Sequence, residues 1–354
     1  MLKILFLSTT VGSLGSGEGG GVELTVQNLA QSIVSRGHHL EVVAPQGSWL
    51  TDIAVTTISG NLQVPVQTQS RDAPTCLPTN SVLANMWEYA LQKQDQYDLI
   101  VNFAFDWLPF YLTPFFSTTI AHFISMGSMT DESDRIMGQV IDRYPGTFGV
   151  YTQAQADTFS FGDRCEILGS AIDLSLYQFN NNPGENLAWL GRIAPEKALE
   201  DAVEAVNRSG TPLKIMGRIQ DRDYWERIRR DFPHAPIEYL GFFDTERLQQ
   251  ELGRCRALLM TPRWIEAFGN VAIEALACGV PVIAYSRGGP SEIVRDGKTG
   301  FLVEPDNIDK LTQAIAKISD IDRLACRQQA EAEYSLAALG ERFETWLTKI
   351  VKSA

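Results

Sequence analysis

The chain has 354 residues, which is too many for one ordinary hydrophobic core and suits two domains. Its apolar content of 44% and charged content of 21% are those of a folded globular protein and exclude a disordered one. The net charge of −13 argues against a nucleic acid or an anionic membrane surface as the main partner.

The first half of the chain alternates predicted strands and helices. We expect apolar strands at 3–8, 39–44, 98–103, 118–123 and 149–152. Helices are expected over 22–36, which Gly37 caps, and over 81–94. This βαβ order predicts a parallel, doubly wound sheet.

A polar, turn-rich stretch over 173–185, which contains Asn180-Asn-Asn-Pro-Gly184, is the best domain boundary. After it the alternation starts afresh, with strands expected at 187–190, 213–216, 237–239, 257–260, 282–285 and 300–303. The helices expected in this half are 199–207, 224–232, 270–278 and 308–318.

The predicted fold class is therefore α/β, with two Rossmann-like, doubly wound parallel-sheet domains that face each other across a cleft. We place the first domain at 1–178 and the second at 185–333. A last amphipathic helix, 336–352, is expected to cross back to the first domain.

Cysteine usage and hydropathy bear on the compartment. Five cysteines are scattered without a CxxC pair, so neither a disulfide framework nor a zinc site is indicated, and a reducing cytoplasm fits. Residues 1–7 contain only four consecutive apolar residues before Ser8, which predicts a strand rather than a signal peptide. The most apolar region, 103–123, carries an aspartate and two prolines, so no membrane-spanning helix is expected.

A glycine-rich run over 12–21 lies between a predicted strand and a predicted helix. Its glycines let the backbone approach a phosphate closely. A formal GxGxxG at Gly15, Gly17 and Gly20 would suggest a dinucleotide cofactor, but the second strand ends at 43–46 without the acidic residue that binds a ribose. A surface loop without a ligand is the other interpretation.

Two cations, Arg192 and Lys197, follow the first strand of the second domain in the run Gly191-Arg-Ile-Ala-Pro-Glu-Lys197. Ligands of open α/β sheets bind at such carboxyl ends of strands. Two cations beside a helix N-terminus would neutralise a diphosphate as it leaves. Exposed charges on an ordinary βα loop are the alternative.

Two glutamates, Glu266 and Glu274, flank a predicted helix start at Gly269-Asn270. A helix N-terminus with small residues binds anions, and carboxylates accept hydrogen bonds from vicinal sugar hydroxyls. An anion site with a carboxylate on each side fits a diphosphate flanked by two sugars. That ligand is a nucleotide sugar.

Two further strand ends in the first domain carry polar residues. His122 is expected at the end of the strand 118–123, where an imidazole can bind a sugar hydroxyl or a developing charge; a satisfied core histidine fits the local sequence equally well. After the strand 98–103, aromatic faces could stack a flat acceptor ring while Asn102 or Asp106 fixes its polar edge. These aromatic residues could also be core.

Two other patterns carry less weight. Gly297-Lys-Thr299 looks like the end of a P-loop, but Glu292 stands where that motif needs glycine. Asp221-Arg-Asp223 and Asp320-Ile-Asp322 are formal DxD pairs, yet both lie in polar stretches at helix ends and are interpreted as solvated surface. No bound metal is expected.

Taken together, the motifs make the chain resemble the family 4 retaining glycosyltransferases of the GT-B fold over nearly its whole length. The matching pieces are Gly19-Gly-Gly21, Gly191-Arg192…Lys197, Glu266…Glu274-Ala, Gly279-Val-Pro281 and Arg295-Asp-Gly-Lys-Thr-Gly300. One departure is Ala198, since many members have glycine after the lysine. We expect from it only a slightly less flexible helix start.

The resemblance implies roles for individual residues. A catalytic set would consist of four side chains: Arg192, Lys197, Glu266 and His122. In it the two cations would grip the donor diphosphate, the glutamate would accept from a sugar hydroxyl, and the histidine would contact the sugar near its 6-hydroxyl. Glu274 would accept from the ribose. The remaining donor contacts would come from Gly20, Gly21, Gly217, Arg218, Phe268, Gly269, Asn270 and Val271.

A narrower likeness, carried by 6–25, 102–109 and 124–128, is to the pteridine glycosyltransferases. It implies transfer of glucose from UDP-glucose, with retention and without a metal or other cofactor, to a side-chain hydroxyl of a reduced pterin such as tetrahydrobiopterin. Acceptor contacts would come from Asn102, Phe105, Asp106 and Glu18.

Several alternatives stay open at this point. The acceptor could be a lipid or a saccharide. A nucleotide-sugar epimerase of the same architecture would make product without an acceptor. A Rossmann dehydrogenase would bind a nicotinamide cofactor, and a sugar-nucleotide sensor would bind UDP without turnover.

Overall fold

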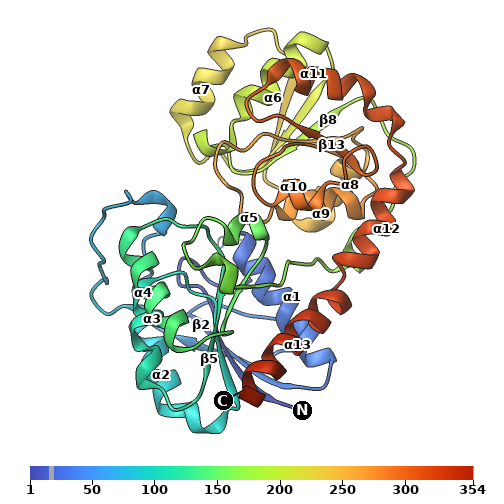
Figure 1. Cartoon of the computed structure of the whole chain (residues 1–354). Coiled ribbons are helices and arrows are strands. Elements are labelled where there is room, and N and C mark those ends of the chain that lie inside the picture. The colour runs from blue at the N-terminus through green and yellow to red at the C-terminus, as the bar shows by residue number, and fades with distance from the viewer. Residues whose placement is uncertain (16–19, 354) are drawn as a thin grey trace. The chain divides into compact units, whose positions relative to one another are not determined.

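The computed structural model describes residues 1–15 and 20–353. The chain forms two compact units, one made of residues 1–171 and the C-terminal segment from Leu336, the other of Ile172–Ser335. Each unit is a parallel sheet covered by helices (Figure 1). The predicted α/β class with two Rossmann-like sheets is confirmed.

The sheet of the first unit has seven strands in the order β3-β2-β1-β4-β5-β6-β7. Its strands are β1 Lys3–Leu7, β2 His39–Pro45, β3 Val55–Ile58, β4 Leu99–Asn102, β5 Ile120–Ile124, β6 Phe148–Val150 and β7 Glu166–Ile167. The helices of this unit are α1 Gly21–Ser35, α2 Val82–Lys93, α3 Trp107–Leu112, α4 Asp131–Arg143, α5 Gln153–Ala156 and α13 Leu336–Ser353.

The sheet of the second unit has six strands in the order β10-β9-β8-β11-β12-β13. Its strands are β8 Leu187–Leu190, β9 Leu213–Met216, β10 Ile237–Gly241, β11 Leu258–Met260, β12 Val282–Tyr285 and β13 Gly300–Val303. Its helices are α6 Leu199–Ser209, α7 Arg222–Asp231, α8 Thr245–Gly253, α9 Asn270–Ala277, α10 Pro290–Ile293, α11 Ile308–Lys317 and α12 Arg323–Glu333.

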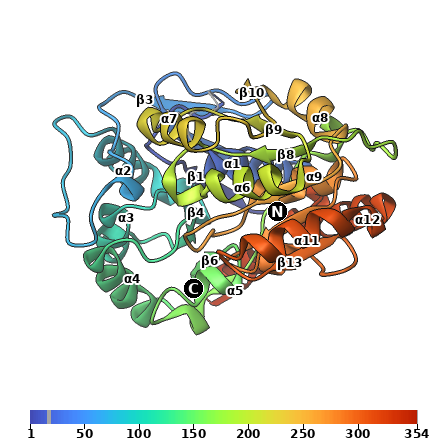
Figure 2. The same ribbon diagram turned by 90° about the horizontal axis from the view of Figure 1, so that it is seen from above.

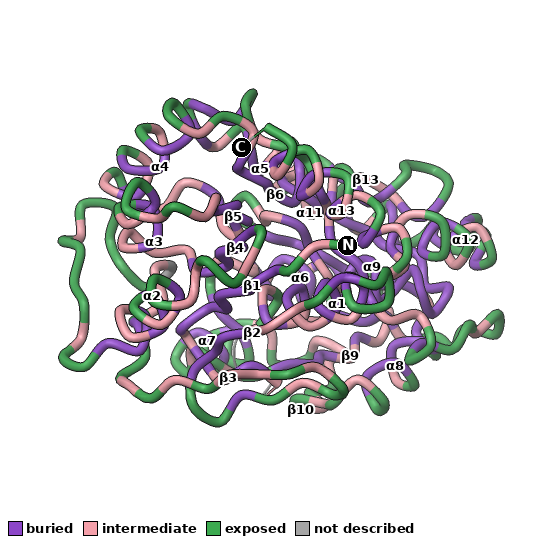
Figure 3. The backbone as a smooth tube through the Cα atoms, turned by 90° about the horizontal axis from the view of Figure 1, so that it is seen from below, coloured by how far each residue is buried: buried purple, intermediate pink, exposed green. Residues whose placement is uncertain are grey.

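The strands of both sheets have the apolar sequences that their burial requires. The central strands are continuous runs of Val, Ile, Leu and Phe that are buried on both faces, as parallel strands under helices must be (Figure 3). In the second unit α6 and α11 lie side by side over the sheet (Figure 2). The strand order reverses between β1 and β4 and between β8 and β11, and such switch points are where open α/β sheets bind ligands.

Every strand and helix expected from the sequence is present, with ends within two residues of the expected ones. The structure adds elements that were not predicted: β3, β7, α3, α4, α5, α8, α10 and α12. Among them α4, α8 and α12 are long but strongly charged. In α4 the buried Ile136, Met137, Val140 and Ile141 recur at helical spacing, so a periodic signal was present there and the prediction overlooked it.

The turn-rich stretch expected as the boundary packs within the second unit. The guanidinium of buried Arg323 donates to the carbonyl of Asn180 at 2.7 Å and to those of Gly253 and Cys255 at 2.9 and 3.0 Å. Arg327 donates to the carbonyl of Tyr177 at 2.8 Å. Two arginines of α12 therefore tie this stretch to the core of the second unit.

The C-terminal helix α13 packs in the first unit, beside α1 (Figure 1). Ser32 donates to the carbonyl of Leu336 at 2.6 Å, and Trp346 donates through Nε1 to the carbonyl of Gly146 at 2.9 Å. None of the helices in the described ranges combines the length and apolar character of a membrane span.

The close packing of α13 on α1 can be tested at Gly340. A Cβ atom there would lie 2.1 Å from Ser32 Oγ and 2.9 Å from Arg36 Cδ, and Ser32 is held by its hydrogen bond to Leu336. We expect Gly340→Ala to lower the free energy of unfolding by about 1–3 kcal/mol, measured by urea unfolding of the full chain.

A matched control is Gly138→Ala in α4, where the nearest atom to a new Cβ would be Phe161 Cδ1 at 3.8 Å. Because alanine is the better helix former, this variant should gain about 0.5–1 kcal/mol. Equal effects of the two substitutions would contradict the proposed packing.

Candidate functional site

The first feature of the site is the turn that leads into α9. Gly269 is the N-cap residue, with a φ of 105° that favours glycine. The backbone of Gly288-Gly289 lies directly against this turn: a Cβ on Gly289 would be 2.1 Å from the carbonyl oxygen of Phe268, and Gly289 N–H donates to the carbonyl of Glu266 at 2.7 Å. The α9 N-terminus and Glu266 are thus held at a fixed position by glycine contacts.

Glu266 forms an ion pair with Lys197 at this turn. The Lys197 ammonium and the Trp264 indole, the latter at 3.0 Å, both donate to Oε2 of Glu266, and the ammonium also lies 4.9 Å from the centre of the Trp264 ring. In the part of the chain that the structure describes, no hydrogen bond reaches Oε1. Burial raises the pKa of Glu266, but the charge and hydrogen bond of Lys197, with smaller effects of Trp264 and Arg192, together lower the net pKa, so the carboxylate is ionised.

Arg192 lies on the same β8 loop and is partly exposed. It forms an ion pair with Glu196 at 2.9 Å and donates to the side chain of Gln220. The neighbouring loop after β9 contains Gly217, where a Cβ would be 1.9 Å from the carbonyl oxygen of Gly191. The next residue, Arg218, is exposed and stacks on the Phe242 ring at 4.3 Å.

The conformation at Lys197 is fixed from behind by the backbone. Ala198 has a φ of 46° in the left-handed region, which costs a non-glycine residue roughly 1–2 kcal/mol. From Ala198 we expected only a slightly less flexible helix start. The structure instead has a left-handed backbone conformation at this residue. Thr261 Oγ1 donates to the carbonyl of Ala198 at 2.8 Å, and Arg263 N–H donates to the carbonyl of Glu196 at 2.9 Å.

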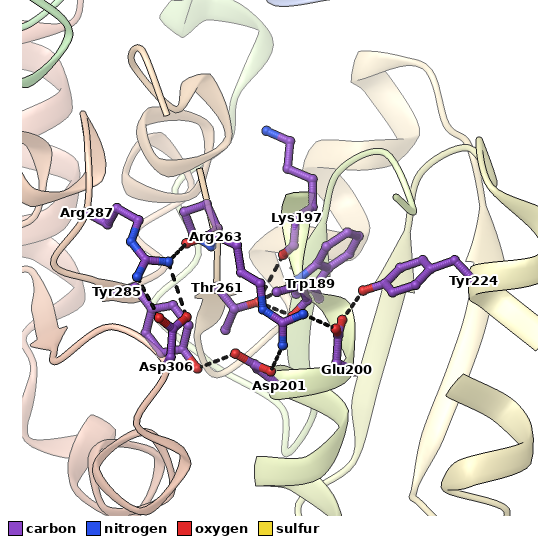
Figure 4. A network of polar contacts seen from close by, with 12 residues as sticks. Trp189, Lys197, Glu200, Asp201, Tyr224, Thr261, Arg263, Tyr285, Arg287 and Asp306 are labelled. Atoms are coloured by element: carbon purple, nitrogen blue, oxygen red, sulfur yellow. Dashed lines mark hydrogen bonds and ion pairs between the residues drawn. The ribbon is translucent and has the colours of Figure 1, made fainter. Parts of the chain in front are cut away.

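A polar network that sequence reasoning missed lies behind this turn (Figure 4). Arg263 forms ion pairs with Glu200 at 2.5 Å and with Asp201 at 2.8 Å, and Tyr285 donates to Asp201 at 2.8 Å. Tyr224 donates to Glu200. The Lys197 side chain points away from these residues in Figure 4, so the network holds the loop and leaves the ammonium outside it.

Glu274 lies one turn into α9 and is buried. Its Oε1 accepts a hydrogen bond from Tyr177 at 2.9 Å, and burial raises the pKa of the carboxyl to about 7. No cation pairs with it among residues 1–15 and 20–353. Tyr177 was not singled out, because it lies in the stretch interpreted as a linker.

The expected position of His122 is wrong. Strand β5 continues to Ile124, so His122 lies in mid-strand rather than at its end, and it is fully buried. Its Nδ1 is 3.2 Å from Asn102 Nδ2 and its Nε2 is 3.0 Å from Thr113 Oγ1. Burial lowers the pKa of the imidazole to about 3. In this structure His122 matches the alternative interpretation, a satisfied core histidine.

The other site residues expected in the first unit differ in how far they are exposed. Asn102 is fully buried, where its side chain bonds the backbone of Ala104 at 3.0 and 3.1 Å, so it supports the loop and is not open to a ligand. Phe105 and Asp106 are partly exposed at the end of β4. Gly20, with a φ of 68°, and Gly21 are exposed at the start of α1, and Glu18 lies outside the described residues.

The two DxD pairs have structural explanations. Asp221 accepts from the N–H of Tyr224 at 2.9 Å and caps α7, and Asp322 accepts from the N–H of Leu324 at 2.9 Å and caps α12. Within the described ranges no three His, Cys, Asp or Glu side chains are grouped as metal ligands.

Comparisons with known proteins agree with this picture. Residues 178–334 match the family model described as "Glycosyl transferases group 1". The chain is 33% identical over 197 residues to D-inositol 3-phosphate glycosyltransferase of Rhodococcus erythropolis, a match that covers 49% of this chain and 43% of the relative. It is 30% identical over 184 residues to a GDP-mannose-dependent mannosyltransferase of Corynebacterium glutamicum that acts on a monoacylated phosphatidylinositol monomannoside, with 47% of each chain covered.

A solved structure extends the likeness over both units. HepE of Anabaena in complex with UDP superposes with a TM-score of 0.77 at 18% identity, covering 98% of this chain and 100% of that one. At this identity the likeness establishes the fold alone. The chain matches less than half the length of the first curated relatives.

The fold is therefore that of the two-domain GT-B glycosyltransferases. The match to the group 1 glycosyl transferase model covers nearly all of the second unit, which contains the turn with Lys197, Glu266 and Glu274.

The buried carboxyl of Glu274 makes a prediction about stability. Its pKa is about 7 in the folded chain and 4.5 for an ordinary, solvent-exposed glutamate, so the folded state binds more protons than the unfolded state between these values. Stability is therefore lost as the pH rises from 4.5 to 7. Glu274→Gln keeps the acceptor for Tyr177 without the charge.

We expect Glu274→Gln to gain up to about 3 kcal/mol over the wild type at pH 8 and close to nothing near pH 4.5, measured by urea unfolding at the two pH values. A difference between variant and wild type that does not change with pH would contradict the raised pKa.

Proposed function

We propose that the chain is a retaining glycosyltransferase that moves a glucosyl group from UDP-glucose to a side-chain hydroxyl of a small acceptor, a reduced pterin such as tetrahydrobiopterin. One observation carries the proposal. Glu266 lies in the turn before α9 and accepts two hydrogen bonds on Oε2, whereas none of the described residues donates to Oε1. A pre-oriented carboxylate oxygen beside an anion site suits a sugar hydroxyl next to a phosphate.

The donor diphosphate would lie at the α9 N-terminus. Backbone N–H groups of the turn Phe268–Val271 and the helix dipole favour negative charge there. Lys197 and Arg192 lie on the β8 loop that is tied to this region through Arg263 and Thr261. Both cations are paired with glutamates in the ligand-free structure, so the diphosphate would take Lys197 from Glu266 and Arg192 from Glu196.

Glu274 would bind the ribose. As a buried carboxyl whose pKa is near 7, it is a stronger acceptor above that pH, when it is ionised. HepE binds UDP, which supports a uridine nucleotide here as well. The GDP-mannose-dependent relative makes another nucleotide the main alternative for the donor.

The chemistry needs charge stabilisation more than a protein base. In the proposed step the bond from the anomeric carbon to the phosphate oxygen breaks, the acceptor oxygen bonds that carbon from the same face, and the departing phosphate oxygen takes the acceptor's proton. Lys197, Arg192 and the α9 dipole would stabilise the negative charge that develops on the diphosphate. With these cations the step needs no metal ion.

The scattered cysteines support a reducing compartment for this reaction, since all five are free thiols and three of them are buried. The proposal as a whole is tested by mass spectrometry of products after incubation with mixed UDP-sugars and reduced pterins. A hexosylated pterin is the expected product. Conversion of a UDP-sugar to its epimer with no acceptor consumed would contradict the proposal.

Lys197→Ala is expected to lower kcat by about two orders of magnitude, because one charge-stabilising contact of this kind is worth roughly 2.7–4 kcal/mol of barrier. Initial rates at saturating donor measure this loss. The matched control is Lys214→Ala, which removes another part-buried lysine of the second unit paired to a glutamate, Glu251 at 2.7 Å. Lys214→Ala should keep a normal kcat, and equal losses in both variants would count against the role of Lys197.

Activity is also expected to survive removal of divalent metal. Rates measured after dialysis against EDTA should equal those of the untreated protein, because the cations of the β8 loop supply the charge. Complete loss that Mg²⁺ restores would overturn the metal-free step.

A further inference from the structure

Asp106 and Gln63 form a polar pair at the end of β4 in the first unit. Nε2 of Gln63 donates to Oδ2 of Asp106 at 2.6 Å. Gln63 is 7% exposed, and its backbone N–H donates to the carbonyl of Thr10, just beyond β1, at 3.1 Å. The pair therefore spans the carboxyl ends of β1 and β4, where the strand order of this sheet reverses.

One acceptor of this pair, the amide oxygen of Gln63, lacks the hydrogen-bond donor that burial demands. Oε1 of Gln63 is sealed from solvent and receives no hydrogen bond from the residues that the structure describes. Asp106 makes no ion pair with any residue in 1–15 or 20–353, and burial raises the pKa of its carboxyl although Gln63 and the N–H groups of Leu108 and Trp107 oppose the rise. A buried acceptor without a donor costs about 1–3 kcal/mol and calls for an explanation.

The chemistry of the pair defines what it would bind. The amide oxygen of Gln63 is bonded to the same carbon as the nitrogen that contacts Asp106. A second acceptor therefore lies beside the carboxylate. A ligand must bring hydrogen-bond donors to both, and must not bring an acceptor. Two adjacent N–H groups on a flat ring, as in a 2-amino-4-oxopyrimidine edge, meet this requirement, and Phe105 is partly exposed at the same strand end.

We propose that Gln63 and Asp106 form the specificity site for the acceptor and read the adjacent N–H groups of a 2-amino-4-oxo heterocycle. The proposal rests on the proposed transferase function, because it names the acceptor class of that reaction. It assigns Gln63 a role that its sequence context did not suggest. Since Oε1 is sealed in the ligand-free structure, binding includes a local movement of the Gln63 segment.

The test uses isothermal titration of the full chain with two probes, 2-amino-4-oxopteridine and 2,4-dioxopteridine. The second probe replaces the amino donor by a carbonyl, which would face the acceptors of Gln63 and Asp106. The wild type should bind the amino probe at least 10-fold more tightly. Asp106→Asn and Gln63→Met should each abolish this preference, and Gln69→Met, on an exposed residue of the same segment, should keep it.

Thermal unfolding separates binding from a structural role. Asp106→Asn keeps an oxygen for Gln63 and removes a buried charge that no cation pairs, so its Tm should equal or exceed that of the wild type. A fall in Tm together with an unchanged probe preference would overturn the assignment. So would equal wild-type affinity for the two probes, or binding of neither.

Titration of the wild type with UDP distinguishes failure of the Gln63–Asp106 assignment from failure of the proposed transferase function. If UDP binds and the two pteridines do not differ, the specificity site is wrong and the donor site stands. If UDP does not bind the wild type, the proposed function itself fails.

Discussion

The ion pair between Lys197 and Glu266 is the interaction on which the donor site depends. It joins the β8 loop to the turn before α9, and it leaves one carboxylate oxygen beside the helix N-terminus without a partner among the described residues. A partly buried pair of this kind is costly to break by removing one partner, because the remaining charge is left unpaired. An anion that replaces Glu266 as the partner of Lys197 avoids that cost for the cation. The ligand-free site thus holds its cation in place by means of a group that a phosphate can displace.

Many contacts in the second unit hold the Lys197–Glu266 ion pair in position. Gly288-Gly289 press against the turn before α9, Thr261 and Arg263 bond the backbone of 196–198, and Asp201 and Tyr285 anchor Arg263 from below. The left-handed Ala198 fits the same scheme, since strain at a functional turn persists only where surrounding contacts impose it. Glu274 is a second destabilising feature of this unit, because its carboxyl is buried and none of the described cations pairs with it. Such groups are commonly retained for binding at the expense of stability.

The sequence predicted the fold well because parallel sheets leave strong local signals. Runs such as 187–190 and 282–285 are apolar throughout, and Gly191 follows the first while Pro281 precedes the second, so their positions matched. His122 was misplaced because β5 continues to Ile124 and the rings of Phe110 and Phe148 pack on the imidazole, which encloses it in the core. Trp264, Tyr177 and Gln63 were missed because each acts through a residue that is distant in sequence. These partners are Lys197 for Trp264, Glu274 for Tyr177 and Asp106 for Gln63. No local pattern encodes such contacts.

The central claim is that a nucleotide diphosphate displaces Glu266 from Lys197 at the N-terminus of α9. A crystal structure of the chain soaked with UDP-glucose tests it most directly. The account predicts density for the diphosphate within hydrogen-bonding distance of the N–H groups at Gly269-Asn270, with the Lys197 ammonium turned onto a phosphate oxygen and Oε1 of Glu266 on a hexose hydroxyl. Density for the diphosphate elsewhere, or Lys197 still on Glu266 beside a bound donor, would contradict it.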